Sequence, residues 1–165
     1  MNIALSDSEV SRLSGMPVIT YNVLRRCGYP CVGSGYVILV RTSPNFGHYV
    51  ALLHRNDGVL EFFDPYGILP DGQLRWNSPG VNVMLDQAVH HLSRILNSFP
   101  GRLEYNNHRF QKSSPMDLTC GRHCAVRLRM LGMNLEQYNN FVRYLCRKLR
   151  VSPSKLVTII SSLLY

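Results

Sequence analysis

The chain alternates between the apolar spacing of strands and that of helices. Three short β-prone runs lie at Tyr36–Val40, His48–His54 and Val59–Asp64. The last two flank the turn sequence Asn56-Asp57-Gly58, so they predict a β-hairpin. In that hairpin the first residue of one strand, His48, and the last of the other, Asp64, are expected at the same end. A further β-prone stretch, Leu103–Phe110, predicts another strand.

Apolar residues three and four positions apart predict helices in the rest of the chain. These cover Leu5–Leu13, one turn at Tyr21–Arg25, Asn82–Ser98, the stretch from Cys120 to Leu131, Asn134–Arg150 and a last helix that starts at Ser152. The first has a capping box of Ser6 and Glu9, and the last begins with Ser152 and Pro153, which favour a helix start. Helix, strands, helix, strand and helices in this order predict an α+β fold.

Composition is consistent with one folded domain over residues 1–165, because 45% of the residues are apolar and the length allows a substantial core. Five cysteines are an odd number, which argues against a secreted disulfide framework and for a reducing, intracellular compartment. The sequence shows no leader, and its apolar runs are too short or too polar to span a bilayer. We therefore expect a protein that is neither secreted nor inserted in a membrane.

The net charge of +8 comes from the last third of the chain. Residues 1–101 hold seven basic and seven acidic side chains, whereas residues 102–165 hold eleven basic and three acidic ones. An excess of this kind favours an acidic partner, and nucleic acid is the obvious candidate. A solvated, arginine-rich helical surface is the alternative interpretation.

A cysteine stands where a polar loop meets a helix. Pro and Ser precede Cys120, while Cys124, Ala125 and Leu128 continue the apolar helical spacing after it. A cysteine at a helix N-terminus meets unpaired N–H groups and the positive end of the dipole, which favour the nucleophilic thiolate. Cys120 is therefore a candidate nucleophile, although many buried cysteines only fill space.

Nucleophilic cysteine chemistry needs a base, a group that orients the base, and donors that hold the oxyanion. The chain offers candidates for these parts in the order His48, Asp64, Gln111 and Cys120. Each has an ordinary structural interpretation when taken alone. His48 could end a strand, Asp64 before Pro65 could start a turn, and Gln111 could be a loop residue.

Four motifs, which contain these four residues in the same order, resemble those of a known protein family. They are Gly47-His48-Tyr49-Val50-Ala51, then Phe62-Phe63-Asp64-Pro65-Tyr66-Gly67, then Gln111, then Thr119-Cys120-Gly121-Arg122-His123-Cys124. From about Val37 to Leu131 the chain resembles the adenain-like cysteine proteases of clan CE. These are the adenovirus proteinase, its relatives in large DNA viruses and Polinton-type elements, and more distantly the proteases that process ubiquitin-like proteins.

The resemblance implies a papain-like-type core, in which helices flank a small, mostly antiparallel sheet and the nucleophile begins a helix. It assigns Cys120 as nucleophile, His48 as general base and Asp64 as the carboxylate that orients the base. Gln111 and the backbone N–H of Cys120 would form the oxyanion hole. Chemistry agrees with the assignment, since Asp64 would fix the tautomer of His48 and Gly121 would leave room for a substrate backbone.

Three features depart from the family pattern. Tyr49 stands where many relatives have Trp, and Asp64 stands where the adenovirus enzyme has Glu, although Asp is usual in the ubiquitin-like-protein branch. The loop from Gln111 to Cys120 is slightly long, so Asn106 or Asn107 is an alternative oxyanion donor.

The resemblance implies an endopeptidase that cleaves after small residues, often Gly, through an acyl-enzyme, in the maturation of viral or mobile-element precursor proteins such as capsid proteins. Alternatives are an isopeptidase acting on ubiquitin or ubiquitin-like conjugates, an acyltransferase with the same site, and an inactive nucleic-acid-binding module. No cofactor is expected; DNA or a peptide is implied as an activator. The enzyme would be monomeric and work in the host cytoplasm, the nucleus or the virion.

Zinc is the remaining alternative at the cysteines. Soft ligands occur as two Cys-x3-Cys pairs, Cys27 with Cys31 and Cys120 with Cys124, and His123 lies between the second pair. That spacing is not the usual zinc knuckle, and a zinc-bound Cys120 would be no nucleophile. We therefore expect no metal.

Overall fold

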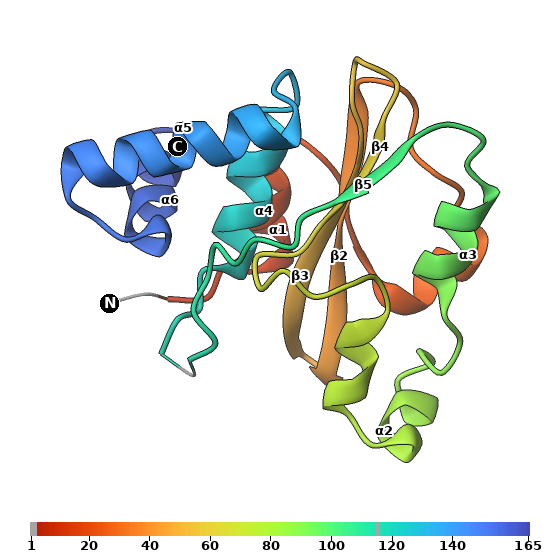
Figure 1. Cartoon of the computed structure of the whole chain (residues 1–165). Coiled ribbons are helices and arrows are strands. Elements are labelled where there is room, and N and C mark those ends of the chain that lie inside the picture. Colours follow the sequence, from red (N-terminus) through yellow and green to blue (C-terminus); the bar gives the residue numbers. More distant parts are fainter. Residues whose placement is uncertain (1–2, 115) are drawn as a thin grey trace.

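A five-stranded mixed sheet forms the centre of the computed structural model, which describes residues 3–114 and 116–165 (Figure 1). The strands lie in chain order: β1 (Val18–Thr20), β2 (Ser34–Ser43), β3 (Phe46–His54), β4 (Leu60–Phe63) and β5 (Leu103–Tyr105). The three central strands are antiparallel, whereas β1 and β5 join the two edges in parallel. The predicted α+β class is confirmed, and the sheet is mixed, with a mostly antiparallel centre between two short parallel edge strands.

The strand predictions are most accurate for strands that pair with the next strand in the sequence. The hairpin of β3 and β4 is confirmed, with Ala51 opposite Phe63. The strand predicted at Tyr36–Val40 extends over all of β2, because β2 pairs with β3 from Ser34 to Ser43. Both edge strands were harder to predict: β1 was missed, and β5 ends at Tyr105 rather than Phe110. Each has three residues and depends on a distant partner strand.

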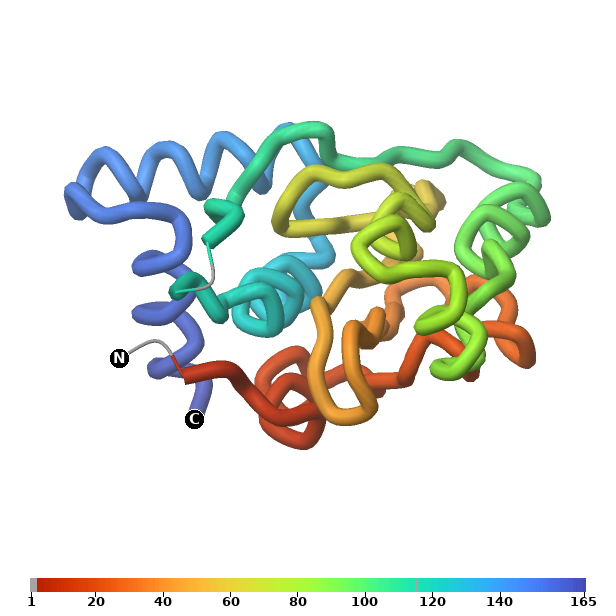
Figure 2. Tube along the Cα trace, turned by 90° about the horizontal axis from the view of Figure 1, so that it is seen from below, coloured from red at the N-terminus to blue at the C-terminus, as the bar shows by residue number. Residues whose placement is uncertain are grey.

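Helices cover both faces of the sheet. On one side lie α1 (Asp7–Ser14), α4 (Cys120–Arg129), α5 (Leu135–Leu149) and α6 (Pro153–Ser162), and on the other lie η1 (Tyr21–Arg26) and α3 (His91–Ser98), with η2 (Gly72–Trp76) and α2 (Pro79–Met84) beside them. Figure 2 shows these two groups on either side of the strands. The run in β2 is apolar throughout because alternate residues enter two cores. Val37 and Leu39 face the first group, and Ile38 faces the second.

Capping residues place most helix starts correctly. Ser6 and Glu9 form the predicted capping box of α1, and Ser152 caps α6 just before Pro153. Asn134 caps α5, so the predicted helix from that residue is confirmed. The predicted turn at Tyr21–Arg25 is the 3-10 helix η1.

The single helix predicted over Asn82–Ser98 is wrong. The segment forms α2 and α3, and between them Asp86 adopts a left-handed conformation with φ 54°. The buried Gln87 side chain donates to the backbone oxygen of Arg41 at 2.6 Å and accepts from its N–H at 3.3 Å. The chain breaks the helix to make these bonds to the end of β2. Met84, which the single-helix prediction placed on the apolar face, is 84% exposed.

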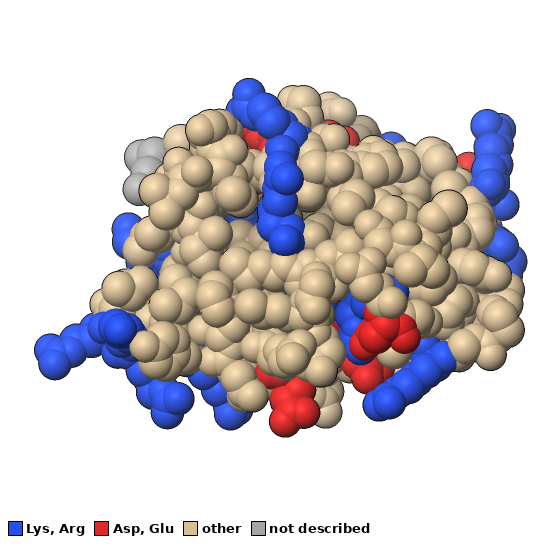
Figure 3. All heavy atoms as spheres, turned by 90° about the horizontal axis from the view of Figure 1, so that it is seen from above, with Lys and Arg blue, Asp and Glu red and all other residues tan. Residues whose placement is uncertain are grey.

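The basic excess of the last third is only partly a surface property. Arg127 on α4 is fully buried, and its guanidinium holds Glu61 of β4 with two bonds of 2.8 Å. On the face in Figure 3, Lys and Arg project from separate places between broad uncharged areas. That face therefore has no single continuous basic patch. Within residues 3–114 and 116–165, no helix is long and apolar enough to cross a membrane.

Candidate active site

An open groove of about 950 Å³ lies beside the start of α4. Its walls come from the N-terminal segment Ala4–Ser8, the end of the β2–β3 hairpin, η2 and the loop that precedes α4. His48, Gln111 and Cys120 all line it. Three of the four predicted site residues therefore share one groove, and Asp64 lies directly behind His48.

The hairpin brings His48 and Asp64 together as predicted. His48 Nε2 and Asp64 Oδ1 are 2.8 Å apart, and the two side chains are 6% and 0% exposed. The pairing of Ala51 with Phe63 puts the first residues of β3 next to the residues that follow β4. Because Nε2 faces the carboxylate, the other ring nitrogen, Nδ1, remains for the groove.

Asp64 is fixed by more partners than the sequence indicated. Its carboxylate accepts the Tyr66 N–H at 2.8 Å and the Gln73 side-chain N–H at 2.6 Å. The amide side chain of Asn106 bonds both the backbone N–H and the carbonyl of Asp64. Gln73, from η2, is a residue that sequence reasoning missed, since no motif relates it to the hairpin. A carboxylate held in this way is oriented before substrate arrives.

Two aromatic rings enclose the imidazole of His48. Tyr66 stacks on it with centroids 4.5 Å apart and a 13° angle between planes, and Trp76 meets it edge-on at 5.2 Å. Both rings line the groove. They shield the histidine from solvent and narrow the entrance on its side.

Cys120 is the first residue of α4, as predicted. Burial raises the pKa of its thiol, but the hydrogen bond and charge of His48 outweigh burial and lower the pKa overall, helped by backbone N–H groups of Tyr49 and Gly121. The pKa of His48 moves the other way. Burial lowers it, and the contacts with Asp64 and Cys120 raise it overall. The pair therefore favours thiolate and imidazolium.

Gln111 is buried at the groove and its amide is engaged. Nε2 donates to the backbone oxygen of Asp117 at 2.7 Å and lies 3.3 Å from the Asp117 carboxylate. The backbone N–H groups of Phe110 and Gln111 both donate to the Pro65 carbonyl, which ties this segment to the residues after Asp64. Asn106 and Asn107, the alternative donors, line a different cavity beside Arg55, and the side chain of Asn106 already holds Asp64.

The role expected for Gly121 needs correction. A Cβ at this position would lie 2.7 Å from Val10 of α1 and 3.1 Å from the ring of Tyr49. The space at Gly121 is therefore filled by the protein's own core, which lets α1, β3 and α4 meet closely. Tyr49 donates its hydroxyl to Asp7 at 2.5 Å and to the Leu5 carbonyl at 3.3 Å, so it forms part of the groove wall.

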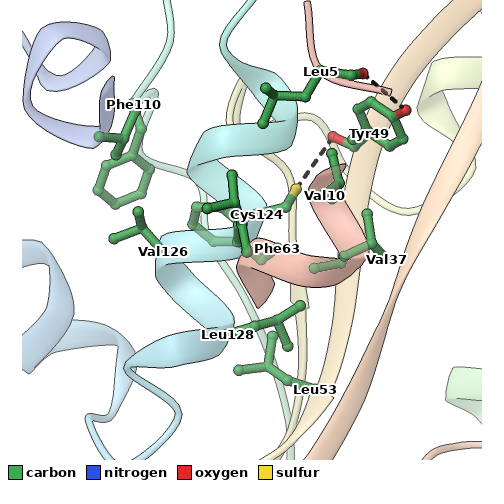
Figure 4. Close-up of a cluster of buried hydrophobic side chains, with 14 of the residues drawn as sticks. Leu5, Val10, Val37, Tyr49, Leu53, Phe63, Phe110, Cys124, Val126 and Leu128 are labelled. Carbon is green, nitrogen blue, oxygen red and sulfur yellow. Dashed lines mark hydrogen bonds between the residues drawn. The ribbon is translucent and has the colours of Figure 1, made fainter. Parts of the chain in front are cut away.

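The remaining cysteines lie in different environments. Cys124 is fully buried one turn after Cys120, donates to the Tyr49 carbonyl and packs with Val10 and Phe63 (Figure 4). Burial raises its pKa well above the usual value, which agrees with a packing role. Cys27 packs against the core on the opposite face of the sheet, so the two Cys-x3-Cys pairs do not converge. Among the described residues, no three His, Cys, Asp or Glu side chains are placed to hold a metal ion.

Comparisons with known proteins give one informative relative. No protein-family model matches the chain. The uncharacterized protein V9 of Sputnik virophage is 34% identical over 125 residues, which cover 76% of this chain and 71% of that protein. Among solved structures, the central domain of the uncharacterized protein Lpg1148 from Legionella pneumophila has a TM-score of 0.40 and 15% identity, covering 98% of this chain and 99% of that one.

Proposed function

We propose that this chain, which belongs to the same family as the virophage protein V9, is a cysteine peptidase with Cys120 as its nucleophile. One observation carries the proposal. A cysteine at a helix N-terminus, with a lowered pKa, shares a groove with a buried histidine that is bonded to a buried carboxylate. That arrangement provides nucleophile, base and orienting group, the parts that acyl transfer through a thioester requires.

The reaction would start with the thiolate of Cys120 attacking a substrate carbonyl carbon. The oxyanion would be held by the N–H of Cys120 and by Gln111, whose second amide hydrogen would exchange its long 3.3 Å bond to the Asp117 carboxylate for one to the oxyanion. Protonated His48 would give its Nδ1 proton to the leaving amine. It would then take a proton from the water that hydrolyses the acyl-enzyme, while Asp64 holds Nε2.

The proposed substrate is a viral or mobile-element precursor protein cut after a small residue such as Gly. The preference for a small residue is what the resemblance to the adenain-like proteases implies, and the virophage origin of the relative supports a viral setting. An isopeptidase acting on ubiquitin-like conjugates is the second candidate, an acyltransferase the third and an inactive nucleic-acid-binding module the fourth. Activation by DNA or a peptide remains part of the proposal, and DNA binding would be steeply salt-dependent.

Hydrolysis of a fluorogenic peptide with Gly before the cleaved bond tests the function. Cys120→Ala and His48→Ala should each abolish turnover, whereas Cys31→Ser, at an exposed cysteine away from the groove, should leave it unchanged. Ubiquitin or SUMO carrying a C-terminal electrophile separates the two peptidase candidates, because covalent capture at Cys120 would favour the isopeptidase. Wild-type turnover by Cys120→Ala would overturn the proposal.

A further inference from the structure

Asp117, three residues before the nucleophile, bonds to more site residues than any sequence motif indicated. Its carboxylate accepts the hydroxyl of Thr119, the backbone N–H of Thr119 at 3.3 Å and the hydroxyl of Ser154 at 2.6 Å. Its carbonyl and carboxylate both face the amide of Gln111. One side chain thus contacts the oxyanion donor, the residue before Cys120 and helix α6.

Thr119 is the N-cap of α4, and it differs from the serine and asparagine caps of the other α-helices. Ser6, Ser78, Asn134 and Ser152 each accept a hydrogen bond from the third residue of their helix. Thr119 makes no such bond to the described residues of α4. Its hydroxyl is instead bonded to Asp117 and lies 3.1 Å from Ser154.

This difference matters at the site. An ordinary cap would accept the N–H of Arg122, the third residue of α4, and would weaken the positive end of the helix dipole that acts on Cys120. Because Asp117 accepts the Thr119 hydroxyl, the N–H of Arg122 receives no side-chain cap and the helix dipole acts on Cys120 undiminished. The Asp117 carbonyl at 2.7 Å, with the carboxylate at 3.3 Å, keeps the Gln111 amide at the groove's edge.

We propose that Asp117 is a positioning residue, which keeps the N-terminus of α4 uncapped and the Gln111 amide in place, so that both supply donors to the thiolate and the oxyanion. The catalytic part of this inference rests on the proposed function. Its geometric part, the uncapped helix, concerns the thiol alone and does not depend on any substrate.

A buried chain of side chains anchors Asp117. Ser154 near the start of α6 donates to it, and His123 Nε2 lies 3.3 Å from the Ser154 hydroxyl. Burial lowers the pKa of His123 to about 3, so this histidine is neutral and brings no competing cation near Asp117. Helix α6 therefore holds the loop that carries the nucleophile.

The test compares Asp117→Ala with Asp117→Asn. Both remove the carboxylate charge, but only Asn retains an oxygen that accepts the Thr119 hydroxyl. The rate at which iodoacetamide alkylates Cys120, followed against pH by mass spectrometry of its peptide, gives the thiol pKa. We expect a pKa about 0.5 higher in Asp117→Ala than in Asp117→Asn, because a freed Thr119 hydroxyl caps α4.

A double variant makes the cause specific. Asp117→Ala with Thr119→Val has no hydroxyl to cap the helix, so its thiol pKa should return to that of Asp117→Asn. In peptide turnover, kcat should fall at least about tenfold in both Ala variants with KM little changed, since the Gln111 donor is loosened. Unfolding midpoints identify the folded variants for comparison.

Two results would overturn the inference: equal thiol pKa values in Asp117→Ala and Asp117→Asn, or no recovery in the double variant. Failure of the proposed function would look different. Peptide turnover would be absent in the wild type, while the difference in alkylation between the Ala and Asn variants would persist.

Discussion

Individual side chains around Asp64 hold the carboxylate that bonds His48. His48, Asp64 and Cys120 could be predicted because their chemistry is specific and the hairpin or helix start that carries each is local. Gln73 and Asp117 could not, since their roles come from loops whose paths depend on the whole fold. The structure adds these two to the site.

Asp64→Asn should lower kcat/KM at least about 100-fold while leaving the fold intact, because Asn has a similar shape but no charge to support the imidazolium. Peptide hydrolysis measures the effect, with Asn140→Ala as the control at an exposed residue of α5. Activity within tenfold of wild type would contradict the assigned role of Asp64.

The pH profile follows from the same pair. Burial lowers the pKa of His48, but Asp64 and Cys120 raise it to about 9. The imidazolium is therefore present below about pH 9, and kcat/KM should fall as pH rises through that value. On the acid side, kcat/KM should fall only when the thiolate of Cys120 is protonated, below its usual range. In Asp64→Asn the alkaline limb should move to lower pH, which a stopped-time assay from pH 5 to 10 would show.

At the scale of elements, local capping predicted α1, α5 and α6 well, whereas the break between α2 and α3 was invisible. Apolar periodicity across Asn82–Ser98 predicts one helix. In the structure the Gln87 side chain bonds the backbone of Arg41 at the end of β2, and the helix is interrupted there. Edge strands β1 and β5 were missed or misplaced for a related reason. Their pairing is non-local, and three residues carry too little pattern to reveal it.

Gln87→Ala should destabilise the protein by about 1–3 kcal/mol, because the part-buried N–H of Arg41 would lose its side-chain partner and the Arg41 carbonyl would keep only Asn77. Urea unfolding measures the change. Asn140→Ala, an exposed position on α5, should stay within about 0.5 kcal/mol. Equal midpoints for the two variants would show that Gln87 does not hold the α2–α3 connection.

At the scale of the whole molecule, a charged network ties α4 to the sheet. Glu61 of β4 is fully buried between Arg127 of α4 and Arg55, and Arg55 also bonds Glu104 of β5. The guanidinium of Arg127 further stacks over Tyr138 of α5. Sequence composition counted these residues as surface charge, since a pattern of single residues does not show which charges will pair inside.

Glu61→Leu should destabilise the protein by about 3–5 kcal/mol, because two buried guanidinium groups would lose their shared carboxylate. The exposed pair of Arg25 and Asp86 provides the control, and Arg25→Met should cost less than about 1 kcal/mol. Urea unfolding compares the two. A similar loss in both variants would mean that the buried network contributes no more than a surface ion pair.

The groove draws on both ends of the chain, and this has a consequence for synthesis. Its wall includes Leu5, its proposed nucleophile is Cys120, and the loop before Cys120 is held by Ser154. Because a ribosome synthesises the chain from the N-terminus, the wall segment around Leu5 has no packing partner until α4 and then α6 emerge. A nascent chain whose α6 is still inside the ribosome therefore lacks the Ser154 anchor of this loop, and the groove should reach its final shape only after α6 has emerged.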